Sequence, residues 1–133
     1  MSEVTNKLLH VLAGRRVTQL KVDFGFTVSL WSPDLYVEIR IEQPFTFTSR
    51  DGRRYHVRPD DIETVCAALQ IFNQVASGAA VDNGALRVEF ESKLSFFVSP
   101  HQKYEAWTIA ASNGLKIVCA PGGELAVWSP PHR

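Results

Sequence analysis

The chain has 133 residues, of which 45% are hydrophobic and 21% are charged, and its net charge is zero. This length is typical of one domain, so we expect a single domain over residues 1–133. The apolar content excludes a disordered chain, which would need fewer apolar residues and more net charge. The balanced charge argues against nucleic-acid binding, because nucleic-acid binders use a basic excess to neutralise phosphates.

The cysteines and the first residues bear on the compartment. Cys66 and Cys119 have no metal-ligand spacing, and we interpret both as small core residues. The chain begins without the basic start and long apolar run of a signal peptide. No segment approaches the roughly 20 apolar residues of a membrane-spanning helix. We therefore expect a cytoplasmic protein with no membrane partner.

Two periodicities follow one another in the first third of the chain. Ser2-Glu3-Val4-Thr5 opens a short helical pattern with Val4, Leu8, Val11 and Leu12 on one face, and Gly14 can end that helix. From Val17 the period changes to two, which is typical of strands with one buried face. This alternation predicts three strands, over residues 17–24, 26–31 and 35–42.

A second group of elements follows Pro44. Residues 45–48 and 53–57 predict a hairpin, because Asp51-Gly52 is a typical turn between two strands. Residues 60–76 predict a central helix with an apolar face at helical spacing, formed by Ile62, Val65, Cys66, Leu69 and Phe72. Five further strands are predicted, over residues 86–90, 94–98, 104–110, 115–119 and 125–128.

The two halves of the chain resemble one another. The matching segments are residues 20–24 with 86–90, 28–31 with 94–97, 32–33 with 99–100 (after which Tyr36 falls near the place of Tyr104), and 51–52 with 113–114. We interpret them as a duplicated unit, with halves at about 15–58 and 80–128 and a linker helix at about 60–76. The alternative is that two meanders look alike because alternation restricts composition. The predicted fold is α+β, with mostly antiparallel β meanders, one N-terminal and one central helix, in two packed sheets or a partial barrel.

Motifs that carry chemistry are sparse. The chain has four histidines, His10, His56, His101 and His132. None has a companion at metal-ligand spacing, and no nucleophile can be paired with any of them from the sequence. Glu38 and Glu42 share one strand face with Arg40 between them, which indicates a solvated sheet face rather than a catalytic pair. The Gly-rich residues 120–124 join two strands, whereas phosphate loops lead from a strand into a helix. We predict no catalytic residue, no metal site and no cofactor.

Aromatic residues near strand ends are the best candidates for a binding surface, because exposed aromatics mark protein interfaces more often than catalytic sites. Strand alternation over residues 104–110 places Trp107 in the core and leaves Tyr104 partly exposed. The candidate partner-binding residues are Tyr104, Glu105, Trp31, Trp128 and Tyr36.

Three segments resemble a known family. They are residues 104–128, with Tyr-Glu-Ala-Trp and Pro-Gly-Gly elements, residues 12–20, and residues 41–46. Together they resemble a family of short actinobacterial proteins that is classed as a domain of unknown function. The resemblance covers nearly the whole chain and implies no activity, cofactor or site residue. The C-terminal motif is also similar to that of some small bacterial immunity proteins.

Three functions are compatible with these observations. The first is a non-enzymatic binding or interaction module, as a homodimer or with a protein partner, of which a toxin-neutralising immunity protein would be a special case. The second is a small-ligand-binding half-barrel with a pocket between its sheets. It would fail if phenylalanines, among them Phe24, Phe26, Phe90, Phe96 and Phe97, fill that interior. The third is an enzyme with a site that the sequence does not reveal.

Overall fold

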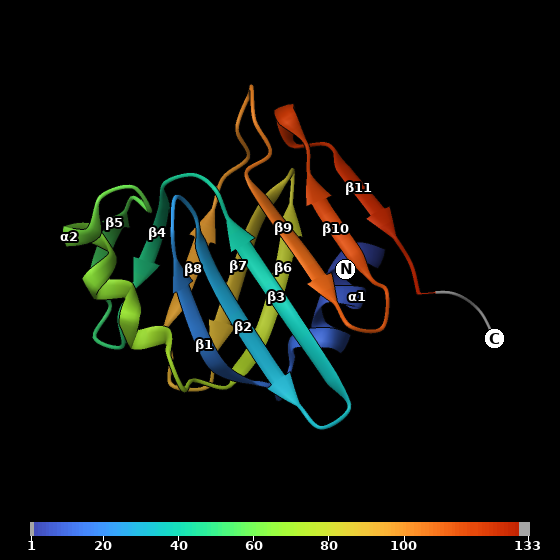
Figure 1. Ribbon diagram of the computed structural model, residues 1–133, viewed down its shortest axis with the longest axis horizontal. Helices are drawn as coiled ribbons and strands as arrows, with labels where there is room; N and C mark the ends of the chain where they lie inside the picture. The colour runs from blue at the N-terminus through green and yellow to red at the C-terminus, as the bar shows by residue number, and fades with distance from the viewer. Residues whose placement is uncertain (1, 131–133) are drawn as a thin grey trace.

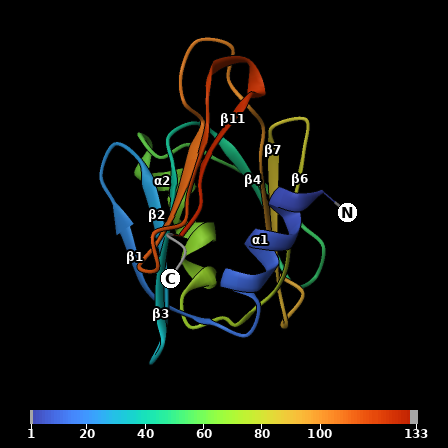
Figure 2. The ribbon, with the colours of Figure 1, turned by 90° about the vertical axis from the view of Figure 1, so that its right-hand side faces the viewer.

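The computed structural model describes residues 2–130 and consists of two antiparallel β-sheets packed face to face, neither closed into a barrel (Figures 1 and 2). Sheet A contains, in spatial order, β1 (Arg16–Val22), β2 (Phe26–Ser32), β3 (Leu35–Ile41), β9 (Trp107–Ala111), β10 (Lys116–Cys119) and β11 (Leu125–Trp128). Sheet B contains β5 (Arg54–Val57), β4 (Phe45–Thr48), β8 (Ser95–Val98), β7 (Ala85–Phe90) and β6 (Ala76–Asp82). The predicted α+β class is confirmed.

Helical segments close the two open sides of the sheet pair. α1 (Glu3–Leu12) lies on the side that faces the viewer in Figure 2, and the Ser2 hydroxyl caps it by accepting a hydrogen bond from the Thr5 amide. α2 (Ile62–Val65) and the 3₁₀ helix η1 (Cys66–Ile71) lie on the opposite side (Figure 1). A second 3₁₀ turn, η2 (Pro121–Gly123), connects β10 to β11. In the described part of the chain, every helix is too short or too polar to cross a membrane.

Each sheet is built from both halves of the chain. The first half runs from α1 through a three-stranded meander in sheet A to a hairpin in sheet B, and the second half repeats this order with the sheets exchanged. The halves meet at the β3–β9 pair, where Ile39 is opposite Ile109, and at the β4–β8 pair, where Phe47 is opposite Phe96. Neither half therefore contains a complete sheet.

The repeated order assigns a counterpart to each strand except β11, which is an additional edge strand of sheet A. Equivalent strands begin about 60 residues apart, as Arg16 of β1 and Ala76 of β6 show, and both of these strands contain a bulge near their start. β1 thus corresponds to β6, so the proposed match of residues 20–24 with 86–90 is shifted by one strand. The match of residues 51–52 with 113–114 falls on equivalent hairpin turns. The duplication of the sequence itself stays a prediction.

The bulge in β1 changes which side chains point inward. Simple alternation along the strand predicts that the Val17 side chain lies on one face and the Leu20 and Val22 side chains on the other. The register shift between Val17 and Gln19 instead pairs Val17, Leu20 and Val22 with the inward residues of β2. Only Val17 is fully buried, and Phe24, beyond the end of the strand, is 89% exposed. The end of β1 therefore extends past the interior of the sheet pair.

The central helix differs most from the prediction. It covers residues 62–71 rather than 60–76, and most of it is a 3₁₀ helix, in which side chains three apart share a face. Val65, Ala68 and Ile71 are buried accordingly. Cys66, Leu69 and Phe72, which are also three apart, point to solvent. The predicted apolar face at α-helical spacing is therefore wrong, and so is the expected burial of Cys66.

The space between the sheets is filled by aromatic and aliphatic side chains. Phe45 contacts Phe26 and Phe96, and Phe96 also contacts Phe90, with ring centroids 5.4–6.2 Å apart. Trp107 is fully buried, as predicted, and its indole N–H donates a hydrogen bond to the carbonyl of Gly84 at 2.9 Å. That bond ties the β6–β7 turn to sheet A.

The 3₁₀ period predicts which residue of η1 stabilises the fold. We expect Ile71→Ala to lower the free energy of unfolding by about 2–5 kcal/mol, because it leaves a cavity in the core. Leu69→Ala, two positions earlier, should change it by less than about 0.5 kcal/mol. Urea denaturation of both variants checks this, and equal losses would contradict the observed face.

The β6–β7 turn predicts a second difference. Gly84 has φ +81, and an added Cβ would lie 2.6 Å from the Gly123 backbone. Gly52 has φ +88 but nothing within 4 Å of an added Cβ. We expect Gly84→Ala to destabilise the protein by about 2–4 kcal/mol, from backbone strain and overpacking together. Gly52→Ala should cost only the strain, about 1 kcal/mol, in the same denaturation experiment.

Candidate functional site

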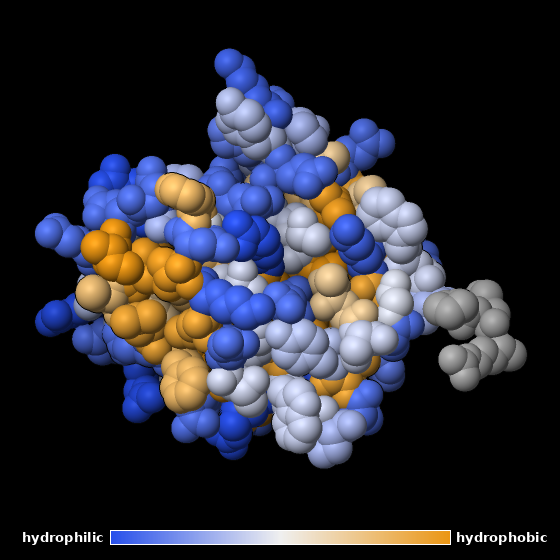
Figure 3. Space-filling model, viewed as in Figure 1, coloured by the Kyte–Doolittle hydropathy of each residue, from blue (hydrophilic) through white to orange (hydrophobic). Residues whose placement is uncertain are grey.

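The outer face of sheet A carries three of the five predicted site residues. The strand register places Trp31 of β2 directly opposite Tyr36 of β3, with both side chains on the outer face. At the opposite edge of the same sheet, Trp128 of β11 is opposite Lys116 of β10. The Lys116 ammonium lies 5.7 Å from the centre of the indole ring. We call Trp31, Tyr36, Lys116 and Trp128 the aromatic face; sheet A is at the front in Figures 1 and 3.

A chain of polar contacts fixes the orientation of Tyr36. Its hydroxyl lies 3.0 Å from a carboxylate oxygen of Glu38 and 3.2 Å from the Ser29 hydroxyl, and Ser29 is completely buried although it belongs to the outer face. The Lys21 ammonium lies 3.6 Å from the other Glu38 oxygen. Because Tyr36 is held in place, the half-exposed Trp31 beside it stands on a rigid support.

Tyr104 and Glu105 do not join the aromatic face. They lie in the loop between β8 and β9, which projects at the top of Figure 1, whereas Trp31 and Tyr36 lie at the other end of the strands. Tyr104 is exposed, and its ring packs on that of His101 at 4.9 Å. The His101 Nδ1 accepts hydrogen bonds from the amides of Lys103 and Tyr104. This imidazole nitrogen therefore shapes the loop.

A second surface was missed by the sequence reasoning. Ile62 of α2, Leu69 of η1 and Phe72 just after η1 are 64%, 48% and 54% exposed, and apolar side chains gather over these elements in Figure 3. We call these three residues the apolar corner. The signal that could have found it is the spacing of three between Leu69 and Phe72, which is also the spacing between the buried Ala68 and Ile71.

A hydrogen bond after η1 places the apolar corner beside the edge of sheet A. The Asn73 amide donates to the Val17 carbonyl of β1 at 3.0 Å. Val22 and Phe24, farther along the same edge, add exposed apolar surface. Contiguous apolar surface marks interaction sites in proteins, and Figure 3 shows apolar side chains gathered over α2 and η1.

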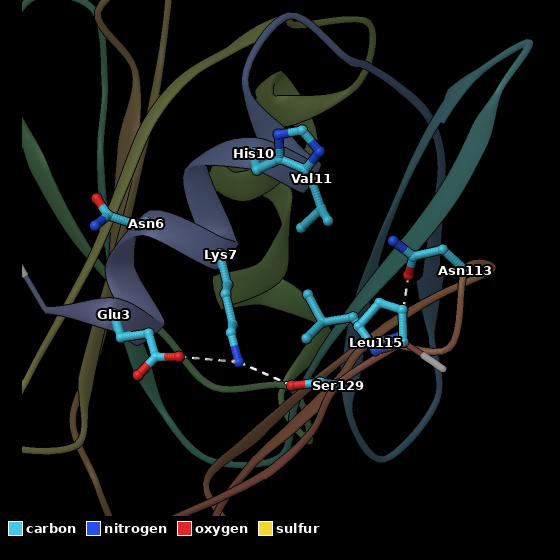
Figure 4. A pocket seen from close by; sticks show the side chains of 9 residues that line it. Glu3, Asn6, Lys7, His10, Val11, Asn113, Leu115 and Ser129 are labelled. Carbon is cyan, nitrogen blue, oxygen red and sulfur yellow. Dashed lines mark hydrogen bonds and ion pairs between the residues drawn. The ribbon is translucent and has the colours of Figure 1, made fainter. Parts of the chain in front are cut away.

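A hollow of about 650 Å³ lies between α1, the β9–β10 turn and the end of β11 (Figure 4). Val11 and Leu115 are its apolar lining. Its one lysine, Lys7, already contacts Ser129 at 2.8 Å and Glu3 at 3.6 Å. The Asn113 side chain accepts a hydrogen bond from the Leu115 amide. These polar groups serve local structure, so the hollow gives no evidence for a particular ligand.

The titratable groups are dispersed. His10, His56 and His101 belong to α1, β5 and the β8–β9 loop. Within residues 2–130, no three side chains of His, Cys, Asp or Glu are grouped closely enough to hold a metal ion. Burial raises the pKa of the Cys119 thiol. Its sulfur lies 3.3 Å from the Gly84 carbonyl, next to the Trp107 indole bond, so Cys119 is a core residue.

An ion pair on the outer face of sheet A holds the β1–β2 turn. Asp23 accepts a hydrogen bond from the Gly25 amide at 2.7 Å and from the Arg40 guanidinium at 3.1 Å. An added Cβ at Gly25 would lie 2.8 Å from the Arg40 guanidinium, so the glycine permits this approach. The Gly25 amide and, after it, the Arg40 guanidinium hold the pKa of the Asp23 carboxyl below its ordinary value.

This ion pair predicts a pH dependence. A carboxyl whose pKa is lower in the folded protein stabilises it above the unfolded pKa, and this contribution is lost as the pH falls through the folded value. We therefore expect the Asp23 carboxyl to titrate below about 3.9 by NMR. Arg40→Gln should raise that midpoint, whereas Arg53→Gln, in a distant turn, should leave it unchanged. A midpoint at or above 3.9 in the unmodified protein would contradict the role of this pair.

Comparisons with known proteins give one match, to a family profile. Neither the curated proteins nor the solved structures include a significant match to this chain. One family profile matches residues 8–129, which is nearly the whole chain and includes the aromatic face and the apolar corner. The chain therefore belongs to the family of unknown function DUF6188.

Proposed function

We propose that this protein is a non-enzymatic interaction module whose apolar corner packs against another protein chain. The observation that carries the proposal is the exposure of Ile62, Leu69 and Phe72 on one short helical segment. Burying a side chain of this kind contributes about 1.5–3 kcal/mol, so three of them could supply the centre of an interface.

The arrangement around the corner supports the same function. The residues sit on a segment whose opposite side, Val65, Ala68 and Ile71, is anchored in the core. An anchored surface loses little conformational entropy on binding. The aromatic face, with two tryptophans, a tyrosine and a lysine, has residue types that are also found at interfaces, so it is the competing surface that the test must separate from the corner.

The partner can be a second copy of the chain or a different protein. The net charge of zero imposes no overall repulsion between two copies, which is compatible with a homodimer. A toxin neutralised by this chain would be one kind of heterologous partner. The alternative of a ligand pocket between the sheets is not proposed, because Phe26, Phe45, Phe90 and Phe96 fill that space. Phe24 and Phe97, expected inside, lie outside the core.

The test compares two surface variants of the full chain. The corner variant is the double substitution Leu69→Ser and Phe72→Ser. Trp128→Ser is the matched control, because Trp128 is 54% exposed, as Phe72 is, but lies on the aromatic face. If the partner is another protein, we expect affinity capture with quantitative mass spectrometry to recover at least tenfold less of it with the corner variant than with the unmodified chain. If the partner is a second copy, light scattering should show a dimer for the unmodified chain and a monomer for the corner variant. The control should behave as the unmodified chain.

Two outcomes contradict the proposal. One is a monomer that captures no protein from its source cells. The other is a partner or dimer retained by the corner variant and lost in the Trp128 variant, which would move the contact to the aromatic face. Circular dichroism and urea denaturation must show that both variants fold.

A further inference from the structure

The outer face of sheet B contains a group of side chains that the interaction surfaces do not use. The register pairs Arg54 of β5 with Thr48 of β4. Two residues along the strand, Thr46 of β4 is paired with Phe97 of β8, which is paired in turn with Arg87 of β7. These five residues line one hollow of about 250 Å³. Figure 2 shows the two sheets as separate layers, so this hollow lies on the opposite side of the molecule from the aromatic face.

Two arginines reach this hollow from strands that are not neighbours. β5 and β7 are separated by β4 and β8, which places their backbones about 14 Å apart. Because both arginines line the same hollow, their side chains extend across the two intervening strands. The Arg87 guanidinium carbon lies 5.2 Å from the centre of the Phe97 ring, which orients one of the two guanidinium groups.

The charge of Arg54 and Arg87 is not neutralised within residues 2–130. Neither forms an ion pair or side-chain hydrogen bond there, and two acids close to Arg54 in the sequence, Asp51 and Asp61, are engaged with other residues. Asp51 contacts Arg53 at 3.4 Å and also the Ser49 hydroxyl, and Asp61 contacts Arg58 at 2.5 Å. Both guanidinium groups therefore line this hollow without an ion-pair partner, and Arg87 also borders a neighbouring hollow that contains Glu89 and Glu91.

Glu89 is the one acidic side chain on the same outer face of β7. It is opposite Ser95, two residues beyond Arg87, and it lines a neighbouring hollow together with Arg87, Glu91 and Lys93. His56 is opposite Thr46 at the edge strand. Glu89 does not line the hollow, but its negative charge lowers the positive potential there. Replacing Glu89 therefore tests the effect of charge without removing a lining residue.

From this arrangement we propose that the hollow binds the phosphate group of a phosphate monoester. Each guanidinium presents a planar set of donors suited to oxyanions, and the Thr46 and Thr48 hydroxyls add two further donors between them. A phosphate monoester has nearly two negative charges and three terminal oxygens, so it can accept from all four groups. A carboxylate has one charge and two oxygens and can satisfy only part of the set. The small volume admits the phosphate and a few attached atoms.

The ligand could be a small phosphorylated molecule or a phosphorylated side chain of a protein, since both present the same group. The proposal does not depend on the apolar corner, because the two surfaces share no residue. A negative result here leaves the interaction function untouched, and the reverse also holds.

The experiment is an NMR titration of the ¹⁵N-labelled full chain at low ionic strength with inorganic phosphate, phenyl phosphate and acetate. We expect saturable shifts at Thr46, Thr48, Arg54, Arg87 and Phe97, and at least tenfold weaker binding of acetate than of phenyl phosphate. Arg54→Gln and Arg87→Gln should each weaken phenyl phosphate binding at least tenfold. Arg53→Gln is the matched control, with the same loss of charge in the same hairpin, and should change the Kd less than twofold.

Two further variants separate the site from a general charge effect. Thr48→Val, which keeps the shape of the side chain but removes its hydroxyl, should weaken binding several-fold. Glu89→Gln should leave binding unchanged or make it tighter. A phosphoserine peptide that binds at least tenfold more tightly than phenyl phosphate assigns the site to a phosphorylated protein, and equal or weaker binding assigns it to a small molecule.

The proposal is overturned by the absence of saturable shifts at these residues. It is also overturned by acetate binding as tightly as phenyl phosphate, or by an equal loss of binding in the Arg53 and Arg54 variants. If one arginine variant fails to fold, the Thr48→Val and Glu89→Gln results decide between these outcomes.

Discussion

The structure depends on the pairing of strands between the two halves of the chain. β3 pairs with β9 and β4 pairs with β8, so each sheet is complete only when both halves are present. The two crossings from one sheet to the other, after β3 and after β8, set the inner faces of the sheets opposite one another. Isoleucines at the first pair and phenylalanines at the second then form the centre of the core. The chain behaves as one packed unit for this reason.

This interleaving leaves two open sides, and the chain closes them unequally. α1 has ten residues and packs along β6, where the Thr5 hydroxyl accepts a hydrogen bond from the Val81 amide. The equivalent segment of the second half, α2 and η1, is mostly a 3₁₀ helix and covers less of the edge of β1. The apolar corner and the exposed end of β1 are the result. The asymmetry between two otherwise equivalent sides thus leaves these apolar residues exposed.

The two outer faces differ in how their charges are satisfied. On sheet A, the acidic side chains Asp23 and Glu38 have basic partners, and the aromatic residues stand among neutralised pairs. On sheet B, Arg54 and Arg87 share a hollow with two threonines and have no acidic partner among the described residues. A protein interface suits the first arrangement, and an oxyanion suits the second. One small fold can therefore present different chemistry on its two sides.

The sequence by itself determined the elements with strong local signals. Clean alternation located β3, the Asp51-Gly52 turn located the β4–β5 hairpin, and alternation over residues 104–110 predicted the burial of Trp107. These features depend on side-chain periodicity and turn chemistry, which are local. β6 was missed, because its alanines, serine and glycine carry little apolar alternation.

The tertiary structure alone decided which surfaces exist. The bulge in β1 and the 3₁₀ period of η1 change the direction of side chains, and both arise where the segment must fit against the other half. The same holds for the site residues: strand register brings Trp31, Tyr36 and Trp128 to one face and leaves Tyr104 and Glu105 in a separate loop. It also brings Arg54 and Arg87 to one hollow, although they are far apart in the sequence. Such contacts depend on strand order between sheets, which no local pattern in this chain specifies.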